Sequence, residues 1–475
     1  MDVYHDLVDD KRLITATGFR FTYENSRASS LLVENLQISS GQLVVLCGKS
    51  GSGKSTFLRL INGLIPDYYE GKLEGQLEIA DQLAGKQSVE ECSKQVASVF
   101  QNPSSQFFHK YVKHELVLPG ENHGQSAAGI LNKLEKLTAD FTLEDYLERD
   151  LSTLSGGEKQ RIALLTALMQ DTDILVLDEP TANLDRSGIE QVASYLSILK
   201  QEGKTILIAE HRLDYLKDLA DRYLYFDQGV LERDYSKKEF DSLTETERHD
   251  LGLRSQQLSS SISRLEAKKQ VAPSPLMGDL TIKNLRLQAG DQELSFLEEA
   301  NFKSGAITAL VGPNGKGKST LAFYLAGLLD DEDATFSLNG HALSAHERLK
   351  DTAFVLQEVA LQLFSDSVQK ELTLGLKKAV DASNILENLG LKGLEDRHPM
   401  TLSGGEMQRL VIASQVLTKK RVFIFDEPSS GLDYQQMLQV ADLLKVLKEQ
   451  GKIILLISHD EELLEKTADY FLTLN

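Results

Sequence analysis

The sequence predicts an α/β fold that occurs twice in tandem along one chain. At 475 residues the chain suits two domains of roughly 200–250 residues each, both large enough for a substantial core. A glycine-rich segment at 48–56 recurs at 312–320. The first copy follows a short apolar run at 42–47 and precedes a helical pattern at 53–62, which is the order strand, loop, helix. The repeat therefore predicts two copies of one α/β domain.

Three further motifs recur in the same order in both halves. Leu-Ser-Gly-Gly-Glu at 154–158 returns at 402–406, and Asp-Glu-Pro at 178–180 returns at 426–428. His211 has its counterpart in His459. The repeat is as long as a domain, so it indicates duplicated domains and not a solenoid of short units.

The join between the halves is predicted from composition. Residues 236–269 are mostly polar and charged, and Ala-Pro-Ser-Pro at 272–275 breaks regular structure. We expect one domain at 1–235, a linker at 236–275 and a second domain at 276–475. The linker would let the domains move relative to each other. Its first part could equally be a C-terminal helix of the first domain.

Composition restricts the classes of function. The formal net charge of −20 disfavours an extensive nucleic-acid footprint, which needs a basic face, although it does not exclude a local basic patch. Only Cys47 and Cys92 are present, so no disulfide framework is expected and a reducing cytosol fits. The histidines form no metal-ligand pattern, and no apolar run approaches the roughly 20 residues that span a bilayer. We therefore expect a soluble protein that reaches any membrane through partners.

The recurring glycine-rich segments fit the phosphate-binding pattern G-x4-G-K-S/T. Glycines let backbone N–H groups turn toward phosphate oxygens, and Lys54 and Lys318 supply a positive charge to them. The hydroxyl groups of Ser55 and Ser319 are suited to Mg²⁺, and the N-terminus of the following helix favours an anion. The predicted ATP-binding residues of the two loops are Gly48, Lys49, Ser50, Gly51, Ser52, Gly53, Lys54, Ser55 and Thr56, and Gly312, Pro313, Asn314, Gly315, Lys316, Gly317, Lys318, Ser319 and Thr320.

An acidic pair ends an apolar run in each half. Asp178 and Asp426 are predicted to hold Mg²⁺ through water, and the adjacent Glu179 and Glu427 to polarise the attacking water. Acidic pairs are common on surfaces, but these two follow buried-strand patterns downstream of a phosphate loop. We predict that Glu179 and Glu427 are catalytic.

The Leu-Ser-Gly-Gly-Glu motif predicts a second anion site. The serine hydroxyl, the bare glycine backbone and a helix N-terminus can all face a phosphate, which makes Ser155, Gly157, Ser403 and Gly405 candidate ATP ligands. A helix N-cap with a capping glutamate explains one such motif equally well. It does not explain why the motif occurs at matching positions in both halves.

With these motifs in this order, both halves resemble the nucleotide-binding domains of ABC ATPases over nearly the whole chain. The resemblance implies two P-loop NTPase domains, each with a RecA-like core, an antiparallel β subdomain and an α-helical signature subdomain. It implies ATP and Mg²⁺ as cofactors. Positions that match the family's motifs are the Mg²⁺-sensing Q-loop glutamines Gln101 and Gln357, the D-loop aspartates Asp185 and Asp433, and the γ-phosphate switch histidines His211 and His459.

The resemblance also implies that the two domains pair head to tail within one chain. Each phosphate loop would then face the signature of the other domain. One site would join Lys54, Gln101, Asp178, Glu179 and His211 to Ser403 and Gly405, and the other would join Lys318, Gln357, Asp426, Glu427 and His459 to Ser155 and Gly157. Both keep a glutamate and a histidine, so both are expected to hydrolyse ATP.

The two halves differ in the aromatic residue that stacks on adenine in this family. Tyr23 matches it in the first half, but Ala289 ends the corresponding run in the second half. Loss of a stacking contact costs about 1 kcal/mol, so weaker or less base-selective binding is expected at the second phosphate loop.

A further shared pattern follows each Q-loop glutamine. At 101–116 and 357–372 the chain reads Gln-x4-Gln, then Phe-Phe or Leu-Phe, then Val-x-x-Glu-Leu. This resembles the ATPases of energy-coupling factor (ECF) importers for cobalt and vitamins, and the fused pair resembles the Yko-type ATPase associated with thiamine-precursor uptake. An alternative is that the pattern only begins the helical subdomain. The candidates for a partner-binding groove are Gln106, Phe107, Phe108, Gln362, Leu363 and Phe364.

The ECF resemblance implies a set of partners. These are a transmembrane T-component and a substrate-binding S-component, with the chain on the cytoplasmic face of the membrane and no nucleic acid bound. A soluble twin-cassette ATPase that acts as a switch on ribosomes or nucleic acid is the alternative. Salt-dependent binding to ribosomes or RNA would favour that alternative.

Overall fold

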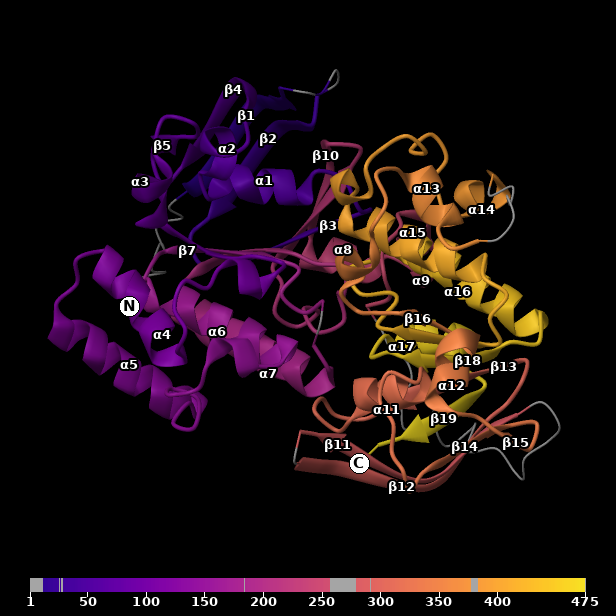
Figure 1. The fold of residues 1–475 in the computed structure, drawn as a ribbon. Helices are drawn as coiled ribbons and strands as arrows, with labels where there is room; N and C mark the ends of the chain where they lie inside the picture. The colour runs from indigo at the N-terminus through magenta and orange to yellow at the C-terminus, as the bar shows by residue number, and fades with distance from the viewer. Residues whose placement is uncertain are drawn as a thin grey trace. The chain divides into compact units, whose positions relative to one another are not determined.

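The computed structural model describes residues 12–24, 26, 29–182, 184–256, 279–290, 292–376 and 383–474. The chain forms two compact units, Met1–Gln256 and Gln257–Asn475, coloured indigo to magenta and orange to yellow in Figure 1. The division falls inside the segment expected to be a linker. Residues 257–275 of that segment lie outside the described part of the chain.

The first unit is built on one sheet in which parallel core strands continue into antiparallel strands. The sheet order is β5-β4-β1-β2-β10-β9-β3-β8-β7-β6. Strands β9, β3, β8, β7 and β6 pair in parallel, while β1 pairs antiparallel with β2 and β4. The strands are β1 Arg12–Tyr23, β2 Leu31–Ser39, β3 Leu43–Gly48, β4 Gly71–Ile79, β5 Gln82–Leu83, β6 Val96–Val99, β7 Ile174–Asp178, β8 Thr205–Ala209, β9 Arg222–Asp227 and β10 Val230–Ser236.

Strand β3 is apolar throughout because both faces of the parallel sheet are covered. All six of its residues are buried. Val45 and Cys47 belong to one hydrophobic cluster, whereas Val44 and Leu46 belong to the cluster on the opposite face. This packing fixes the end of β3, from which the phosphate loop starts.

Helices of the first unit follow the expected pattern. Helix α1 begins directly after the glycine-rich loop, and α4, α5 and α6 lie together in Figure 1 as the helical region between β6 and β7. The α-helices are α1 Lys54–Ile61, α2 Leu64–Asp67, α3 Val89–Ser93, α4 Val112–Asn122, α5 Ala127–Phe141, α6 Gly156–Met169, α7 Arg186–Gln201, α8 Lys237–Ser242 and α9 Glu245–Asp250, with 3-10 turns η1 Pro103–Ser105 and η2 Leu151–Thr153.

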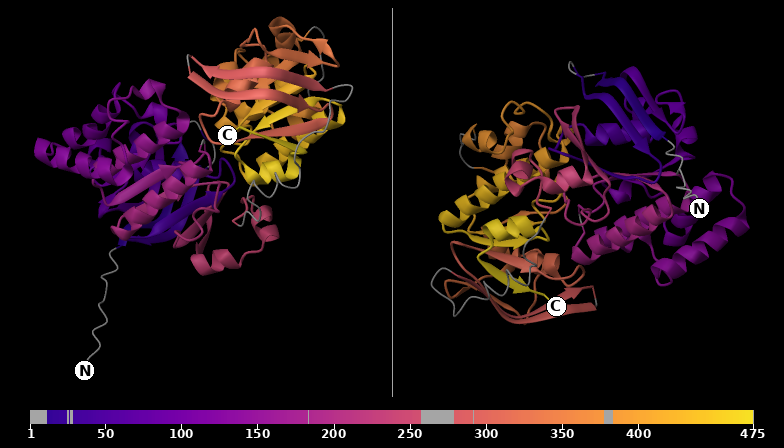
Figure 2. Two further views of the ribbon diagram at one scale, coloured as in Figure 1. Left: turned by 90° about the horizontal axis from the view of Figure 1, so that it is seen from below. Right: turned by 180° about the vertical axis from the view of Figure 1, so that it is seen from behind.

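The second unit repeats this plan with its sheet in two parts. The parallel part has the order β16-β17-β18-β13-β19, which matches β6-β7-β8-β3-β9, and the antiparallel part has the order β12-β11-β14-β15. Figure 2 shows the long strands β11 and β12 running side by side. The strands are β11 Leu280–Ala289, β12 Gln292–Phe302, β13 Ala306–Val311, β14 Thr335–Leu338, β15 His341–Ala342, β16 Thr352–Val355, β17 Val422–Asp426, β18 Ile453–Ile457 and β19 Tyr470–Thr473.

The helices of the second unit occupy corresponding places. The described helical region between β16 and β17 has shorter helices before the signature than the first unit has. The α-helices are α11 Lys318–Leu325, α12 Ala345–Asp351, α13 Val368–Thr373, α14 Ser383–Asn388, α15 Gly404–Val416, α16 Tyr434–Glu449 and α17 Glu461–Thr467, with 3-10 turns η3 Val359–Gln362 and η4 Pro399–Thr401. Thus both units show the predicted α/β core, antiparallel strands and helical signature region.

The described part of the expected linker packs on the first unit. Phe240 of α8 stacks on Tyr223 of β9 with ring centroids 3.8 Å apart. The guanidinium of Arg248 is buried, and it donates to the Phe240 carbonyl at 3.0 Å. Residues 237–256 therefore extend the first unit, as in the alternative of a C-terminal helix.

None of the described helices combines the length and the apolar character that a membrane crossing requires.

Candidate nucleotide sites

Each phosphate loop connects a buried parallel strand to a helix through left-handed glycines. Gly48 and Gly312 have φ of 138° and 141°. A Cβ atom at Gly48 would collide with the carbonyl oxygen of Phe226, and one at Gly312 with that of Leu474. Only glycine permits this turn so close to the neighbouring backbone.

The lysine of each loop lies over the loop carbonyls. Lys54 Nζ donates to the carbonyl oxygens of Gly48 and Lys49, both at 2.9 Å. Lys318 Nζ donates to the Gly312 carbonyl at 2.8 Å and to Asn314 Oδ1 at 3.2 Å. Both ammonium groups are thus held inside the loop, where phosphate oxygens would compete for them.

The expected Mg²⁺ ligands lie next to each other in both units. Ser55 Oγ donates to Asp178 Oδ1 at 3.1 Å, and Ser319 Oγ donates to Asp426 Oδ2 at 2.8 Å. No group of three or more His, Cys, Asp or Glu side chains could hold a metal ion within the described ranges. A hydroxyl and a carboxylate nevertheless fit Mg²⁺, which binds through one or two protein oxygens, phosphates and water.

Glu179 stands at the centre of the first site. Gln101 Nε2 donates to Glu179 Oε2 at 2.8 Å, and His211 Nε2 lies 3.5 Å from Glu179 Oε1. Burial, together with the charges of the neighbouring Asp178 and Glu210, raises the pKa of Glu179 to about 8, although Lys54 and the hydrogen bond from Gln101 act in the opposite direction. Burial lowers the pKa of His211 well below its usual value, and the charges of Lys54 and Arg254 lower it too. The two side chains therefore meet as a carboxyl with raised proton affinity and a neutral imidazole.

Glu427 occupies the equivalent position in the second site. The His459 backbone N–H donates to Glu427 Oε2 at 3.3 Å, and His459 Nε2 lies 3.8 Å from Glu427 Oε1. The imidazole also lies 3.2 Å from Asn314 Oδ1 of the phosphate loop. Thus the structure joins loop, glutamate and histidine within the second unit.

Both glutamates have a strained backbone. Glu179 has φ of 47° and Glu427 has φ of 51°, values that non-glycine residues rarely adopt. The backbone N–H of each donates to the neighbouring strand, at Ala209 and Ile457 respectively, both at 2.9 Å. Such strain is characteristic of functional positions, where the surrounding fold maintains it.

The two sites differ behind the switch histidine, which sequence reasoning missed. Glu210 of the first unit is 2% exposed and accepts from Thr181 Oγ1 at 2.6 Å and from Tyr215 OH at 3.1 Å. It also accepts from the backbone N–H groups of His211 and Arg212. In the sequence, this difference could have been found by comparing Ala-Glu-His-Arg at 209–212 with Ile-Ser-His-Asp at 457–460.

In the second unit a different pair makes the same connection. Ser429 Oγ donates to Asp460 Oδ2 at 2.6 Å, and the Asp460 backbone N–H donates to Ser458 Oγ at 3.1 Å. In both units a buried carboxylate next to the switch histidine thus accepts a hydrogen bond from the residue that follows Asp-Glu-Pro. In the first unit the carboxylate belongs to Glu210, which precedes the histidine. In the second unit it belongs to Asp460, which follows the histidine.

The signature serines cap helices. Ser155 caps α6 and Ser403 caps α15, each in a reciprocal capping box with the glutamate three residues later, Glu158 or Glu406. This confirms the N-cap interpretation of the motif. It is compatible with anion binding, because the serine hydroxyl caps only the N–H of the third helical residue, and the first N–H groups of a helix have no partner within the helix.

Tyr23 lies beside the first phosphate loop. Its hydroxyl is 3.1 Å from Thr56 Oγ1 and accepts from Arg59 Nη1 at 3.4 Å. Tyr69, which sequence reasoning did not single out, approaches Tyr23 edge-on with ring centroids 6.5 Å apart. The side chain of Ala289 lies outside what the structure describes.

The Gln-x4-Gln pattern after each Q-loop glutamine has a local structural role. Gln106 Oε1 accepts from the Phe100 backbone N–H at 2.8 Å, and its Nε2 donates to the Ser98 carbonyl at 3.0 Å. Gln362 makes the same two bonds to Leu356 and Phe354, at 2.8 and 2.7 Å. These glutamines therefore fix the turn after the strand.

The Val-x-x-Glu-Leu pattern fixes the next turn and exposes a phenylalanine. Glu115 accepts from the backbone N–H groups of Phe108 and His109 at 2.9 and 2.8 Å, and Glu371 does the same for Phe364 and Ser365 at 2.9 and 2.7 Å. Phe108 is 83% exposed and Phe364 is 77% exposed. In contrast, Phe107 and Leu363 pack against the cores. A cavity of about 610 Å³ borders Phe108.

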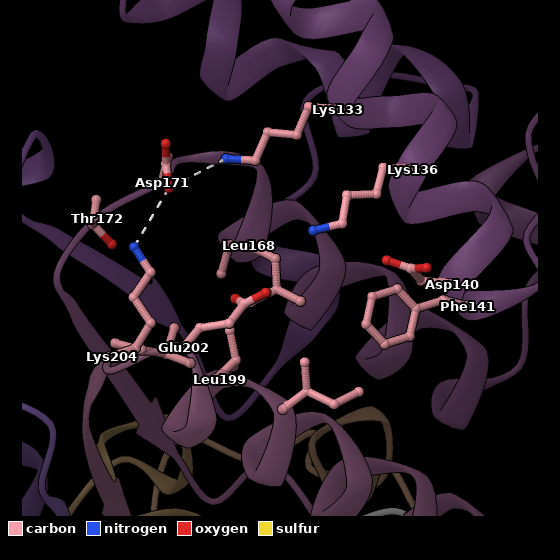
Figure 3. Close-up of a pocket in the computed structure, with 13 residues that line it drawn as sticks. Lys133, Lys136, Asp140, Phe141, Leu168, Asp171, Thr172, Leu199, Glu202 and Lys204 are labelled. Atoms are coloured by element: carbon pink, nitrogen blue, oxygen red, sulfur yellow. Dashed lines mark hydrogen bonds and ion pairs between the residues drawn. The ribbon is translucent and has the colours of Figure 1, made fainter.

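A second cavity of about 680 Å³ lies between α5, the end of α6 and α7 (Figure 3). Lys133 and Lys204 both approach Asp171, at 3.7 and 3.4 Å. Leu168 and Leu199 line its apolar wall. None of the site residues predicted from the sequence lines this cavity.

Comparison with known proteins establishes the family. The sequence matches the ABC transporter family at residues 33–182 and 298–430, more than half of the chain. This chain belongs to the ABC ATPase family. We refer to its two units as cassette 1 and cassette 2, and the family membership supports ATPase activity and ATP binding.

Relatives align along the whole length of this chain. An ABC transporter ATP-binding protein of Treponema denticola is 37% identical over 468 residues, which cover 98% of this chain and 95% of the relative. One from Methanosarcina mazei is 31% identical and covers 96% and 92%. The two-cassette organisation is therefore shared with these relatives.

Solved structures show the same tandem fold. An RNase-L inhibitor aligns with a TM-score of 0.65 at 23% identity, covering 96% of this chain and 87% of that one. ABCE1 bound to the ribosome with archaeal Pelota aligns with a TM-score of 0.70 at 21% identity, covering 96% and 76%.

These structures contradict the partners predicted from the ECF resemblance. The expectation of a transmembrane T-component and a substrate-binding S-component, without nucleic acid, was wrong. Tandem structures that match along this chain include an RNase-L inhibitor and ABCE1 on the ribosome. The Q-loop pattern was a poor indicator of membrane partners. Gln106 and Glu115 accept hydrogen bonds from the backbone of their own turns, and this role needs no membrane partner.

Proposed function

We propose that this chain is a twin-cassette ATPase whose ATP-driven closure and reopening act as a switch on the ribosome. The similarity that carries the proposal is the tandem arrangement it has in common with ribosome-bound ABCE1 over 96% of this chain. A second solved complex, of ABCE1 with an archaeal ribosomal stalk protein, aligns with a TM-score of 0.61.

The chemistry assigns one role to each group. Lys54 and Lys318 neutralise the β- and γ-phosphates, and Ser55 with Asp178, or Ser319 with Asp426, would hold Mg²⁺, which offsets charge at the phosphates. Glu179 and Glu427 orient and polarise the attacking water. His211 and His459 lie within 4 Å of these carboxylates, at 3.5 and 3.8 Å, where each can contact the γ-phosphate.

Closure of the two cassettes on each other would complete both nucleotide sites. Each ATP would be held between the phosphate loop of one cassette and the signature serine of the other, Ser403 or Ser155. The position of both serines at helix N-termini, at the starts of α6 and α15, supports this role, because the first N–H groups of a helix can bind phosphate oxygens.

The surface that contacts the ribosome is proposed to be apolar and not basic. A net charge of −20 opposes broad contact with RNA. The exposed rings of Phe108 and Phe364, each fixed on a turn next to its Q-loop glutamine, suit contact with a ribosomal protein.

Co-sedimentation with ribosomes tests the proposal. The double variant Glu179→Gln, Glu427→Gln should bind ATP without hydrolysing it and should sediment with ribosomes only when ATP is present. The control Lys54→Ala, Lys318→Ala should stay in the supernatant. Absence of ribosome binding, or binding that ignores ATP, would reject a role on the ribosome.

The relatives with the higher sequence identity favour a second candidate. The proteins at 37% and 31% identity are described as ABC transporter ATP-binding proteins. In this alternative the same ATPase cycle energises the uptake of a vitamin, of cobalt or of a thiamine precursor. ATP-dependent uptake that disappears in the Glu179→Gln, Glu427→Gln variant, without ribosome binding, would favour it.

A further inference from the structure

Helix α1 leaves one of its faces partly open at the end of the first phosphate loop. Phe57 and Leu58 of this helix are buried in the core, whereas Thr56 and Arg59 are only half-buried. Residues three positions apart in a helix are neighbours on one face, so Thr56 and Arg59 belong to the same face. Thr56 is also the last residue of the phosphate-binding motif. Arg59 therefore stands beside the site at which a nucleotide would leave the loop.

Two tyrosines from other parts of cassette 1 meet at this face. Tyr23 ends β1, and its hydroxyl lies 3.1 Å from Thr56 Oγ1. Tyr69 follows α2, and its backbone N–H donates to the Leu64 carbonyl at 3.2 Å. The two ring centroids are 6.5 Å apart with 74° between the ring planes, which is an edge-to-face arrangement. The rings thus form an aromatic corner next to the phosphate-binding motif.

The guanidinium of Arg59 contacts both rings of this corner. Arg59 Nη1 donates to Tyr23 OH at 3.4 Å, and Arg59 Cζ lies 4.4 Å from the ring centroid of Tyr69. A cation over an aromatic face is attracted by the negative charge of that face. Arg59 covers one face of Tyr69, while 37% of the tyrosine remains exposed. One side chain therefore holds two rings in place and leaves aromatic surface open to solvent.

The sequence of cassette 2 offers no counterpart of this corner. The repeat of the phosphate loop places Phe323 where cassette 1 has Arg59, and Phe323 packs on Phe354 with ring centroids 5.7 Å apart. Ala289 ends the run that corresponds to β1, and residues 326–334, between α11 and β14, include no aromatic residue. The combination of two tyrosines with an arginine is thus particular to cassette 1.

We propose that Arg59 is a positioning residue that holds Tyr23 and Tyr69 as a binding surface for the base of the nucleotide in cassette 1. The inference rests on the nucleotide site of the proposed function and not on its ribosomal partner. Aromatic rings bind bases by stacking. Because Arg59 already holds both rings, the base would not have to order them when it binds. Cassette 1 would therefore bind a nucleotide through its base and its phosphates, and cassette 2 mainly through the phosphates.

Two ligands separate a contact with the base from a contact with the phosphates. In the full chain, Lys318→Ala confines binding to cassette 1, and calorimetry measures the dissociation constants of ADP, which has a base, and of inorganic tripolyphosphate, which has none. Arg59→Leu and Tyr69→Ala should each weaken ADP binding by about 5-fold or more and tripolyphosphate binding by less than about 2-fold, because the lost contact is stacking on the base.

Conservative variants and a control sharpen this test. Tyr69→Phe should keep the affinity for ADP, since the ring and not the hydroxyl supplies the contact. Arg59→Lys should recover part of the affinity that Arg59→Leu loses, because an ammonium group is also attracted to an aromatic face. Arg20→Leu, which changes an exposed arginine on the same strand as Tyr23, is the matched control and should alter neither constant.

The outcomes separate this proposal from the site on which it rests. Unchanged ADP affinity in Arg59→Leu, or equal weakening of ADP and tripolyphosphate binding, would overturn the role of Arg59. If Arg59→Leu does not fold, Tyr69→Ala decides in the same way, because it removes a side chain at the surface. Lys54→Ala should abolish binding of both ligands. If Lys54→Ala binds them normally, the assigned phosphate site itself is wrong.

Discussion

At the scale of single residues, the two cassettes share their proposed catalytic groups and differ in the residues that support these groups. Glu179 and Glu427 have the same strained backbone and the same histidine neighbour. Behind the histidine, however, cassette 1 buries Glu210 where cassette 2 has Ser458. The sequence predicts two hydrolytically competent sites from the shared groups, and the supporting residues add a difference between the cassettes to the predicted difference in adenine stacking.

Replacing Glu210 should therefore harm cassette 1 more than the matching change harms cassette 2. Glu210→Ala leaves the hydroxyls of Thr181 and Tyr215 and two backbone N–H groups without their acceptor. We expect a loss of at least about 4 kcal/mol in the free energy of unfolding, since each of these four buried groups costs about 1–3 kcal/mol when it is left unsatisfied. Ser458→Ala, which removes a single hydroxyl, should cost about 1 kcal/mol. Chemical denaturation and ATPase assays measure both, and equal losses would contradict this asymmetry.

A dependence on pH follows from the raised pKa of Glu179. In the folded protein the pKa of this carboxyl is about 8, whereas in the unfolded chain it is the usual 4.5. Between these values the folded state binds the extra proton, so its stability falls as pH rises. Glu179→Gln removes this fall and should gain roughly 1 kcal/mol or more relative to the wild type between pH 5 and pH 8.5.

Thermal denaturation without nucleotide or Mg²⁺ measures that difference. Glu190→Gln, an exposed change on α7, is the control and should follow the wild type at each pH. A stability difference between Glu179→Gln and wild type that stays constant with pH would show that Glu179 titrates normally.

At the scale of elements, the side chains of one glutamine and one glutamate fix the turn after each Q-loop strand. Gln106 bonds back to β6, and Glu115 of α4 bonds to the backbone of Phe108 and His109. Since the same bonds recur around Gln362 and Glu371, the turn is built identically in both cassettes. Its effect is to hold a large apolar ring in solvent.

Glu115→Ala should loosen this turn without unfolding the cassette. Two backbone N–H groups lose their acceptor, so the segment around Phe108 should open more often. We expect limited chymotrypsin digestion to cleave after Phe108 several-fold faster, with ATP binding retained. Glu121→Ala, on the exposed face of the same helix, is the control. Equal cleavage rates in the two variants would show that Glu115 does not hold the turn.

The sequence predicted those elements whose residues act locally. Glycine spacing predicts the phosphate loop because left-handed φ values at Gly48 and Gly312 leave few alternatives, and the capping box predicts the starts of α6 and α15. Contacts distant in sequence could not be predicted. Glu210 meets Thr181, and Gly252 meets Lys49, only because the sheet brings separate strands together. The polar composition of 236–256 likewise concealed that Phe240 and Arg248 are buried.

At the scale of the whole molecule, duplication within one chain gives the cassettes a fixed stoichiometry. Tandem fusion supplies one partner for every cassette, so pairing would not depend on protein concentration. The proposed head-to-tail pairing also makes every site dependent on both cassettes. Lys54 would share a nucleotide with Ser403, and Lys318 would share one with Ser155.

Counting the nucleotides that remain bound tests this pairing. In the Glu179→Gln, Glu427→Gln background, which should trap ATP, we expect two ATP per chain after rapid gel filtration. Lys54→Ala should reduce this to one. Adding Ser403→Ala should then change nothing, because both substitutions affect the same site, whereas adding Ser155→Ala should remove the remaining ATP. If each cassette instead used its own signature, the pattern would be reversed: Ser155→Ala would be silent in the Lys54→Ala protein, and Ser403→Ala would empty it.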